Sequence, residues 1–161
     1  MQLQSHTGPG ATSRAISIDQ LVAQRAEIPK VILLVDDDDA LPFLFRRVLK
    51  QLNPHPALHY LPNAVRAKDY LLGRLEFADR TAYPWPDLVL LDLRLPVFDG
   101  FEFLEWARSR TEFKALPIFV LSDSINPRDL TRADQLGATS FLVKPTEVEA
   151  LIPPIKALLQ L

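Results

Sequence analysis

Cysteine is absent from this chain of 161 residues. Its absence excludes a disulfide framework, a thiolate nucleophile and a zinc site built on thiolates. Lysine and arginine together number 18, aspartate and glutamate 20, and the net charge is −2. The basic residues form no cluster of the kind that neutralises nucleic-acid phosphates, so we expect no nucleic-acid partner.

Long apolar runs are also lacking. They stop at about five residues, far below the ~20 that a membrane-spanning helix needs. The first residues do not follow the charged-then-apolar order of a signal peptide. We therefore expect a soluble protein in the cytoplasm, with no membrane contact. A hydrophobic content of 48% is sufficient for a core, and the length predicts a single domain.

The first residues differ in composition from the rest of the chain. The segment from Ser5 to Ser13 is small and polar without periodicity, which predicts disorder. Apolar residues between Ile16 and Ala26 predict one short amphipathic helix. We therefore expect an N-terminal extension over residues 1–29, followed by one folded domain over residues 30–161.

From Val31 onward, strand and helix patterns alternate. Strands are predicted at 31–35, 57–61, 87–91, 117–121 and 139–143. Helices are predicted at 41–52, at 101–109 and near the C-terminus. A further helix is predicted from a cap at Asn63 to Phe77, with Val65, Leu71, Leu72 and Leu75 facing inward. Another is predicted from a cap at Asn126 to Gly137. This order predicts an α/β fold, a doubly wound five-stranded parallel sheet with helices on both faces.

Several helix ends can be predicted from local patterns. Asp38 or Asp39 is the expected N-cap of the first helix. The segment Thr146-Glu147-Val148-Glu149 has the pattern of a capping box. Pro153-Pro154 would interrupt a helix that began there, because proline within a helix removes an amide donor and clashes with the preceding turn. We expect a short turn at 147–152 and a second helical piece from about Pro154.

Carboxylates follow two of the predicted strands. The apolar run 87–91 leads into Asp92, and the run 31–35 leads into Asp36 and Asp37. Open parallel sheets place their chemistry beyond the carboxyl ends of their strands. Carboxylates that converge there repel one another unless a hard divalent cation lies among them. The sequence therefore predicts a cation site at this edge of the sheet.

Two further strand ends carry polar groups. Ser122 follows one strand and Lys144 follows another. Separately they are typical of a turn residue and a solvated lysine. Together with the acids they fit a site for a phosphoryl group. Asp92 would be the nucleophile, neighbouring acids would hold Mg²⁺, and the hydroxyl and the ammonium would bind phosphoryl oxygens.

At this point the chain resembles the response-regulator receiver domains of two-component signalling, over about residues 30–161. The resemblance implies a flavodoxin-like fold. It is carried by an acid pair, the pattern Asp-x-x-x-Pro-x-x-Asp-Gly, a hydroxyl and a Lys-Pro pair, here Asp36, Asp37, Asp92, Pro96, Asp99, Gly100, Ser122, Lys144 and Pro145.

The resemblance also implies a role for each site residue. Asp92 would be the phospho-acceptor, and Mg²⁺ would be held by Asp36, Asp37, Asp92 and the backbone carbonyl of Arg94. Ser122 would move to meet a phosphoryl oxygen, and Lys144 would pair with the phosphoryl group. Phe141 would be the aromatic switch residue.

By the same resemblance, a sensor histidine kinase donates the phosphoryl group and the modified domain switches a partner-binding surface. The protein would be a signalling switch and not a turnover enzyme. The long segment before residue 87 and the lack of an output domain after the last strand resemble stand-alone regulators of phytochrome-type kinases. A homodimer is a further partner that the resemblance allows. The last helix commonly contributes to the dimer and partner face in this family, and Pro153-Pro154 would alter that face here. The downstream protein partner is not indicated.

Two residues depart from the family pattern. Asp123 follows the switch hydroxyl, where the family usually has a small residue. It would either slow phosphoryl entry at the mouth of the site or serve as a solvated loop residue or helix cap. Phe141 replaces the more usual tyrosine, and it could be a core aromatic of its strand.

Two other functions remain as alternatives. A hydrolase of the haloacid-dehalogenase type also uses a strand-end aspartate and Mg²⁺, but it needs a second acid where this chain has Arg94. A receiver that serves only as a phosphorylation-independent interaction module would be expected to lack the acceptor or the acid pair, and this chain has both.

Overall fold

We describe the fold from a computed structural model, which describes residues 30–53, 55–123, 126–144 and 146–159. The predicted extension over residues 1–29, its short helix and Pro145 lie outside these residues. Within the described residues, no helix is both long enough and apolar enough to cross a membrane.

The centre of the fold is a parallel five-stranded sheet in the order β2-β1-β3-β4-β5. The strands are β1 (Val31–Val35), β2 (Ala57–Leu61), β3 (Leu88–Asp92), β4 (Ile118–Ser122) and β5 (Ser140–Val143). All residues of β1 and β3 are buried, whereas β5 at one edge has none that is fully buried. The continuous apolar runs that predicted central strands are therefore the ones covered on both faces.

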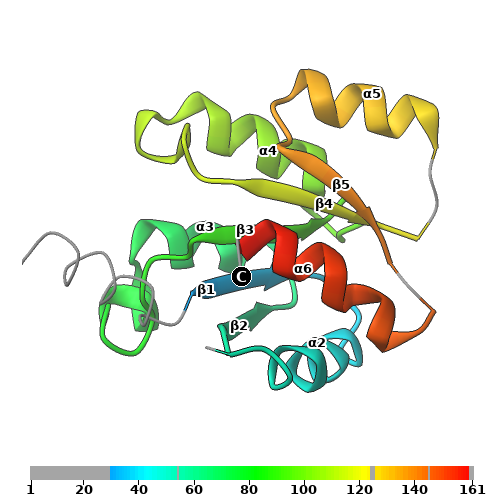
Figure 1. The fold of residues 1–161 in the computed structure, drawn as a ribbon. Coiled ribbons are helices and arrows are strands. Elements are labelled where there is room, and N and C mark those ends of the chain that lie inside the picture. Colours follow the sequence, from blue (N-terminus) through cyan, green and yellow to red (C-terminus); the bar gives the residue numbers. More distant parts are fainter. Residues whose placement is uncertain (1–29, 54, 124–125, 145, 160–161) are drawn as a thin grey trace, which may run out of the picture.

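Helices cover both faces of the sheet (Figure 1). The α-helices are α2 (Leu41–Leu49), α3 (Ala64–Leu72), α4 (Gly100–Ser109), α5 (Pro127–Gln135) and α6 (Ile152–Leu159), and the 3₁₀ turns are η1 (Leu75–Ala78), η2 (Thr111–Phe113) and η3 (Val148–Leu151). Helices α2 and α6 lie on one face, and α3, α4 and α5 lie on the other. This arrangement confirms the predicted doubly wound sheet.

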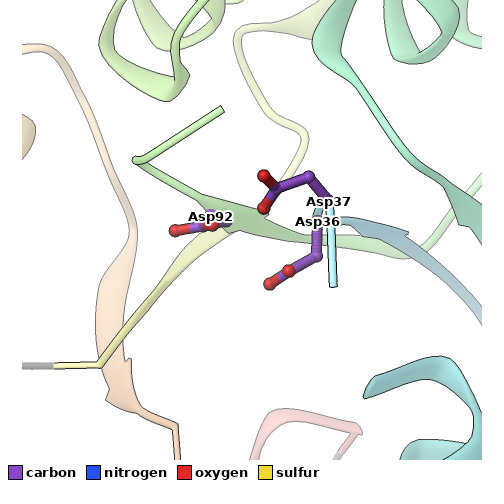
Figure 2. A group of neighbouring side chains, drawn as sticks. All are labelled: Asp36, Asp37 and Asp92. Carbon is purple, nitrogen blue, oxygen red and sulfur yellow. The ribbon is translucent and has the colours of Figure 1, made fainter. Parts of the chain in front are cut away.

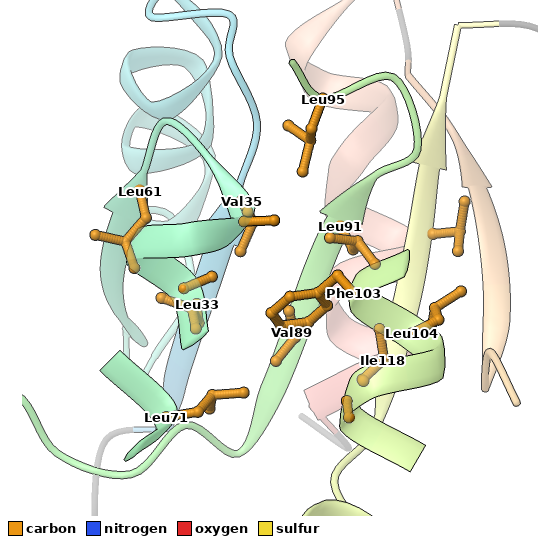
Figure 3. Packing of buried hydrophobic residues seen from close by; sticks show 14 of the residues in the cluster. Leu33, Val35, Leu61, Leu71, Val89, Leu91, Leu95, Phe103, Leu104 and Ile118 are labelled. Atoms are coloured by element: carbon orange, nitrogen blue, oxygen red, sulfur yellow. The ribbon is translucent and has the colours of Figure 1, made fainter. Parts of the chain in front are cut away.

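Each face of the sheet has its own hydrophobic cluster. On the face covered by α3 and α4, Val89 and Leu91 of the central strand pack with Phe103 and Leu104 of α4 (Figure 3). On the other face, Phe45 of α2 belongs to a cluster with residues of α6 and the strands. These clusters fix the strand ends relative to one another, which positions the site described below.

Three predictions about α3 were wrong. The helix ends at Leu72 and not at Phe77, because Gly73 adopts a left-handed conformation with φ of 62° that terminates it. Leu75 lies beyond this turn and is 71% exposed. Val65 is 51% exposed, because the buried face of the helix is formed by Ala64, Ala67, Tyr70 and Leu71.

Other helix ends differ in detail. The N-cap of α2 is Ala40, although the carboxylate of Asp38 accepts a hydrogen bond from the Ala40 amide (3.0 Å). The predicted capping box at Thr146 does not form, because η3 begins after Glu147 without a side-chain cap. The turn expected before the last helix is η3, and α6 begins at Ile152, so that Pro153-Pro154 fall within its first turn, where proline is tolerated.

Candidate functional site

The predicted site residues lie at one edge of the sheet. Asp36 directly follows β1, Asp92 ends β3, Ser122 ends β4 and Lys144 directly follows β5. All four strands are parallel, so their carboxyl ends meet at the same edge. The backbone amide of Lys144 donates to the carbonyl of Ser122 at 2.8 Å, which ties these two ends together.

The aspartates at the ends of β1 and β3 are held in the same way. Oδ1 of Asp36 accepts a hydrogen bond from the amide of Asp38 (2.9 Å). Oδ1 of Asp92 accepts one from the amide of Arg94 (3.1 Å). Each carboxylate therefore closes an Asx-type turn over the start of the following loop. One oxygen of each is used in this turn, and the other, Oδ2, faces Lys144.

Lys144 pairs with both carboxylates. Its Nζ lies 2.7 Å from Oδ2 of Asp36 and 3.4 Å from Oδ2 of Asp92. The side chains of Asp36, Asp92 and Lys144 are 0%, 6% and 12% exposed. Burial of charge at this depth is costly without a partner, and the ammonium supplies it.

Burial and ion pairing shift the pKa values of these groups in opposite directions. Burial raises the pKa of Asp36, and the ammonium of Lys144 and the hydrogen bond donated by the amide of Asp38 only partly offset this rise. Burial alone would lower the pKa of Lys144, but the nearby carboxylates of Asp36, Asp92 and Asp123 outweigh it and raise the pKa. Lys144 is therefore held as an ammonium ion by its neighbours.

The structure brings together three of the predicted cation ligands. One carboxylate oxygen from each of Asp36, Asp37 and Asp92 lies within 4.8 Å of the others. The three side chains come from the ends of β1 and β3 and lie close together (Figure 2). Asp37 is exposed while the other two are buried. Three oxygen donors with one open side suit a hard divalent cation that retains several water ligands.

The predicted switch residues are placed less directly. Ser122 is partly buried at the end of β4, and it has an interaction partner within the protein. Phe141 lies opposite Val120 in the pairing of β4 with β5, and it is partly buried against the core cluster. Its packing is compatible with both a switch residue and a core aromatic.

The loop after β3 returns to the sheet through Asp99 and Gly100. Asp99 caps α4, and its carboxylate and that of Glu102 form a capping box with each other's amides (2.9 and 2.8 Å). A β-carbon at Gly100 would meet the carbonyl oxygen of Asp92 and would lie 2.6 Å from Cα of Leu93. Glycine is therefore required for α4 to begin this close to the end of β3.

Asp129, which lies near the site, was not identified from the sequence. The Arg94 side chain turns toward α5, where Nη2 lies 2.7 Å from Oδ2 of Asp129. No local pattern links the two residues, because their contact depends on how α5 packs beside the β3–α4 loop. An acid in the first turn of a helix is a common stabilising feature, so sequence alone would not single out Asp129.

The comparisons with known proteins agree with this geometry. Residues 32–156 match the family model of the response regulator receiver domain. This chain belongs to that family.

Individual relatives match over most of their length. The chain is 37% identical over 126 residues to the probable methanogenesis regulatory protein FilR2 of Methanothrix harundinacea, covering 78% of this chain and 79% of the relative. It is 32% identical over 130 residues to the response regulator Rcp1 of Synechocystis sp., covering 81% and 86%.

Among solved structures, the phosphorylated cyanobacterial phytochrome response regulator RcpA matches with a TM-score of 0.72 and 31% identity, covering 81% of this chain and 91% of that one. The Mn²⁺-bound form of Rcp1 matches with a TM-score of 0.70 and 32% identity, covering 80% and 93%. The flavodoxin-like receiver fold and the response-regulator class predicted from the sequence are thus confirmed.

Proposed function

We propose that residues 30–161 form a receiver domain that accepts a phosphoryl group on Asp92 from the phosphohistidine of a sensor histidine kinase. The observation that carries this assignment is the pairing of buried Asp92 with Lys144 beside two more acids at the same edge of the sheet. A carboxylate held in this way is oriented for attack, and a cation lies ready for the incoming charge.

The transfer exchanges one bond to phosphorus for another. Oδ2 of Asp92 attacks phosphorus as the P–N bond to the donor imidazole breaks, and the electron pair of that bond stays on the imidazole nitrogen. The product is an acyl phosphate with ~2 negative charges. Lys144 moves its ammonium from the carboxylates to a phosphoryl oxygen, and the Ser122 hydroxyl donates to another.

The acidic triad fits a divalent cation, and we propose Mg²⁺ as its natural ligand. Asp36, Asp37 and Asp92 would hold it, together with the backbone carbonyl of Arg94. When bound, it neutralises the negative charge that the carboxylates and the phosphoryl group bring together. The buried position of Asp36 and the open position of Asp37 support one face of protein ligands and one face of water.

A charge change at Asp92 would reach the surface through β4 and β5. When the Ser122 hydroxyl moves toward the phosphoryl group, it vacates space beside β5, and the half-buried Phe141 can turn inward to fill it. The readout is then a changed surface around β5, where a downstream protein or a second copy of the chain would bind. Hydrolysis of the acyl phosphate resets the domain, so the protein acts as a switch and not as a turnover enzyme.

The similarity to RcpA supports a finer proposal, that the donor is a phytochrome-type kinase. RcpA is a cyanobacterial phytochrome response regulator. A purified phytochrome kinase that labels this chain much faster than an unrelated histidine kinase would support this assignment, and equal slow labelling by both would contradict it.

The hydrolase alternative is disfavoured by Arg94. In a haloacid-dehalogenase-type site, the residue two positions after the nucleophile is an acid that transfers a proton. Here it is an exposed arginine paired with Asp129. Steady release of phosphate over many turnovers would support a hydrolase, whereas labelling that stops at one phosphoryl group per chain supports a receiver.

The deciding experiment labels the protein with acetyl phosphate and Mg²⁺ and measures its intact mass. We expect one phosphoryl group on the wild type and none on Asp92→Asn, which keeps the shape of the side chain but removes its charge and nucleophile. Asp39→Asn removes an exposed acid from the same edge and serves as the matched control, with labelling retained. Labelling of Asp92→Asn at the wild-type rate would refute the assignment, as would a wild type labelled by neither acetyl phosphate nor a kinase.

A further inference from the structure

An ion pair connects the loop after β3 to α5, the helix that follows the switch hydroxyl. Nη2 of Arg94 lies 2.7 Å from Oδ2 of Asp129. Arg94 lies two residues after Asp92, and Asp129 lies in the first turn of α5, which follows Ser122 in the chain. The contact thus joins two strand ends of the candidate site from outside the acidic triad.

The side chains of Arg94 and Asp129 differ in how exposed they are and in how freely they can rotate. Asp129 is 23% exposed and lies at the N-terminal end of a helix, where backbone amides and the helix dipole stabilise a carboxylate. The Arg94 side chain is 72% exposed, although its backbone amide is held by Oδ1 of Asp92. The guanidinium can therefore rotate to another partner while the base of its side chain stays beside the acceptor.

A phosphoryl group on Asp92 would compete for this guanidinium. It carries ~2 negative charges against one on Asp129, and its oxygens match the paired donors of arginine. We propose that Asp129 is a positioning residue that withholds Arg94 from the phosphoryl group in the unmodified protein and so slows labelling. The inference rests on the proposed acceptor role of Asp92.

The coupling works in both directions, because linkage between two binding events is reciprocal. If a phosphoryl group draws Arg94 away from Asp129, the first turn of α5 loses a tie to the β3–α4 loop. A partner that binds Asp129 and displaces Arg94 would then favour phosphorylation by the same factor. The pair would therefore link the chemistry at Asp92 to the α5 surface independently of Ser122 and Phe141.

The test is a double-mutant cycle on the initial rate of acetyl-phosphate labelling at low ionic strength with Mg²⁺ present. Asp129→Asn should raise the rate by about 1.5- to 5-fold, the range that exposed ion pairs support. The same substitution in an Arg94→Gln background should have no effect. Asp129→Glu keeps the charge and should resemble the wild type, and Asp134→Asn, an exposed acid on the same helix, controls for the loss of one negative charge.

A second measurement follows the guanidinium itself. The side-chain NMR signal of Arg94 should shift when beryllofluoride, a phosphoryl analogue, is added to the wild type, and should already be displaced in Asp129→Asn. An equal rate gain in both backgrounds would reduce the effect to net charge and overturn the inference, as would an unchanged rate or an unmoved signal. A wild type that takes up neither phosphoryl group nor beryllofluoride would instead refute the acceptor assignment, and the inference with it.

Discussion

The Nζ atom of Lys144 lies 2.7 Å from Oδ2 of Asp36 and so connects the ends of β5 and β1, which are not neighbours in the sheet. The same ammonium lies 3.4 Å from Oδ2 of Asp92 on β3, one of the two strands between them. One ammonium is thus the shared counter-charge of two buried carboxylates. The site is organised by charge in advance, and any incoming cation or anion must rearrange this pairing.

Replacing Lys144 with methionine should therefore destabilise the metal-free protein. The change leaves Asp36 and Asp92 buried without a counter-charge, which costs 3–5 kcal/mol at fully enclosed sites, and we expect about 2 kcal/mol here because Asp37 opens the pocket to water. Mg²⁺ should restore more stability to Lys144→Met than it adds to the wild type. Lys156→Met, an exposed lysine on α6, is the control. Equal melting temperatures for both variants would contradict the role of Lys144.

Mg²⁺ should stabilise the wild type through ligand linkage. At ten times its dissociation constant, a ligand that binds only the folded state adds about 1.4 kcal/mol, or roughly 3–6 °C in melting temperature for a domain of this size. Asp37→Ala should abolish most of this shift and leave the metal-free protein at least as stable as before, because the loss of this exposed acid relieves repulsion within the triad.

The matched control for that experiment is Asp39→Ala, which removes an exposed acid from the same run but outside the triad. Its Mg²⁺-dependent shift should equal that of the wild type. A wild-type melting temperature that millimolar Mg²⁺ leaves unchanged would argue against a cation site at these carboxylates.

The central strands and their terminal residues could be predicted from the sequence, because runs such as Val31–Val35 are buried on both faces and parallel strands bring their carboxyl ends together. The length of α3 was predicted wrongly, although Gly73 offered the signal for its end. The pairing of Arg94 with Asp129 could not be predicted, because it depends on the packing of α5, which no local pattern records.

Gly100→Ala should disturb the acceptor strand directly. The added β-carbon would meet backbone atoms of Asp92 and Leu93 that cannot move aside without displacing the end of β3. We expect a loss of about 1–3 kcal/mol in unfolding free energy, as for other overpacked sites, together with slower labelling of Asp92. Glu105→Ala, on the exposed face of the same helix, should leave both unchanged. Chemical denaturation of the two variants would measure the difference.

His59 should make the stability depend on pH. Burial lowers its pKa from the usual 6.5, with a smaller contribution from the charge of Arg46, and its ring packs 5.5 Å from that of Tyr70. The unfolded chain therefore binds a proton more readily than the folded one. The contribution of neutral His59 to the free energy of unfolding is fully present above pH 6.5. It is lost as the pH falls through the lower pKa that His59 has in the folded state.

His59→Phe keeps an aromatic ring but cannot titrate. The stability of the wild type should fall relative to this variant as the pH is lowered from 7.5 toward 5, measured by urea unfolding at each pH. Parallel curves for the two proteins over this range would contradict the prediction.

Asp123 should slow the entry of anionic phosphodonors. It is exposed directly after Ser122, and its charge is close enough to help raise the pKa of Lys144, so it lies near the path by which a phosphoryl group arrives. Asp123→Ala should speed acetyl-phosphate labelling at low salt, and the gain should shrink as salt rises, because exposed charges are screened over about 10 Å at 0.1 M ionic strength. Asp134→Ala, further along α5, should give no such salt-dependent gain. If Asp123→Ala is labelled at the wild-type rate at low ionic strength, Asp123 is a loop residue without a part in the reaction.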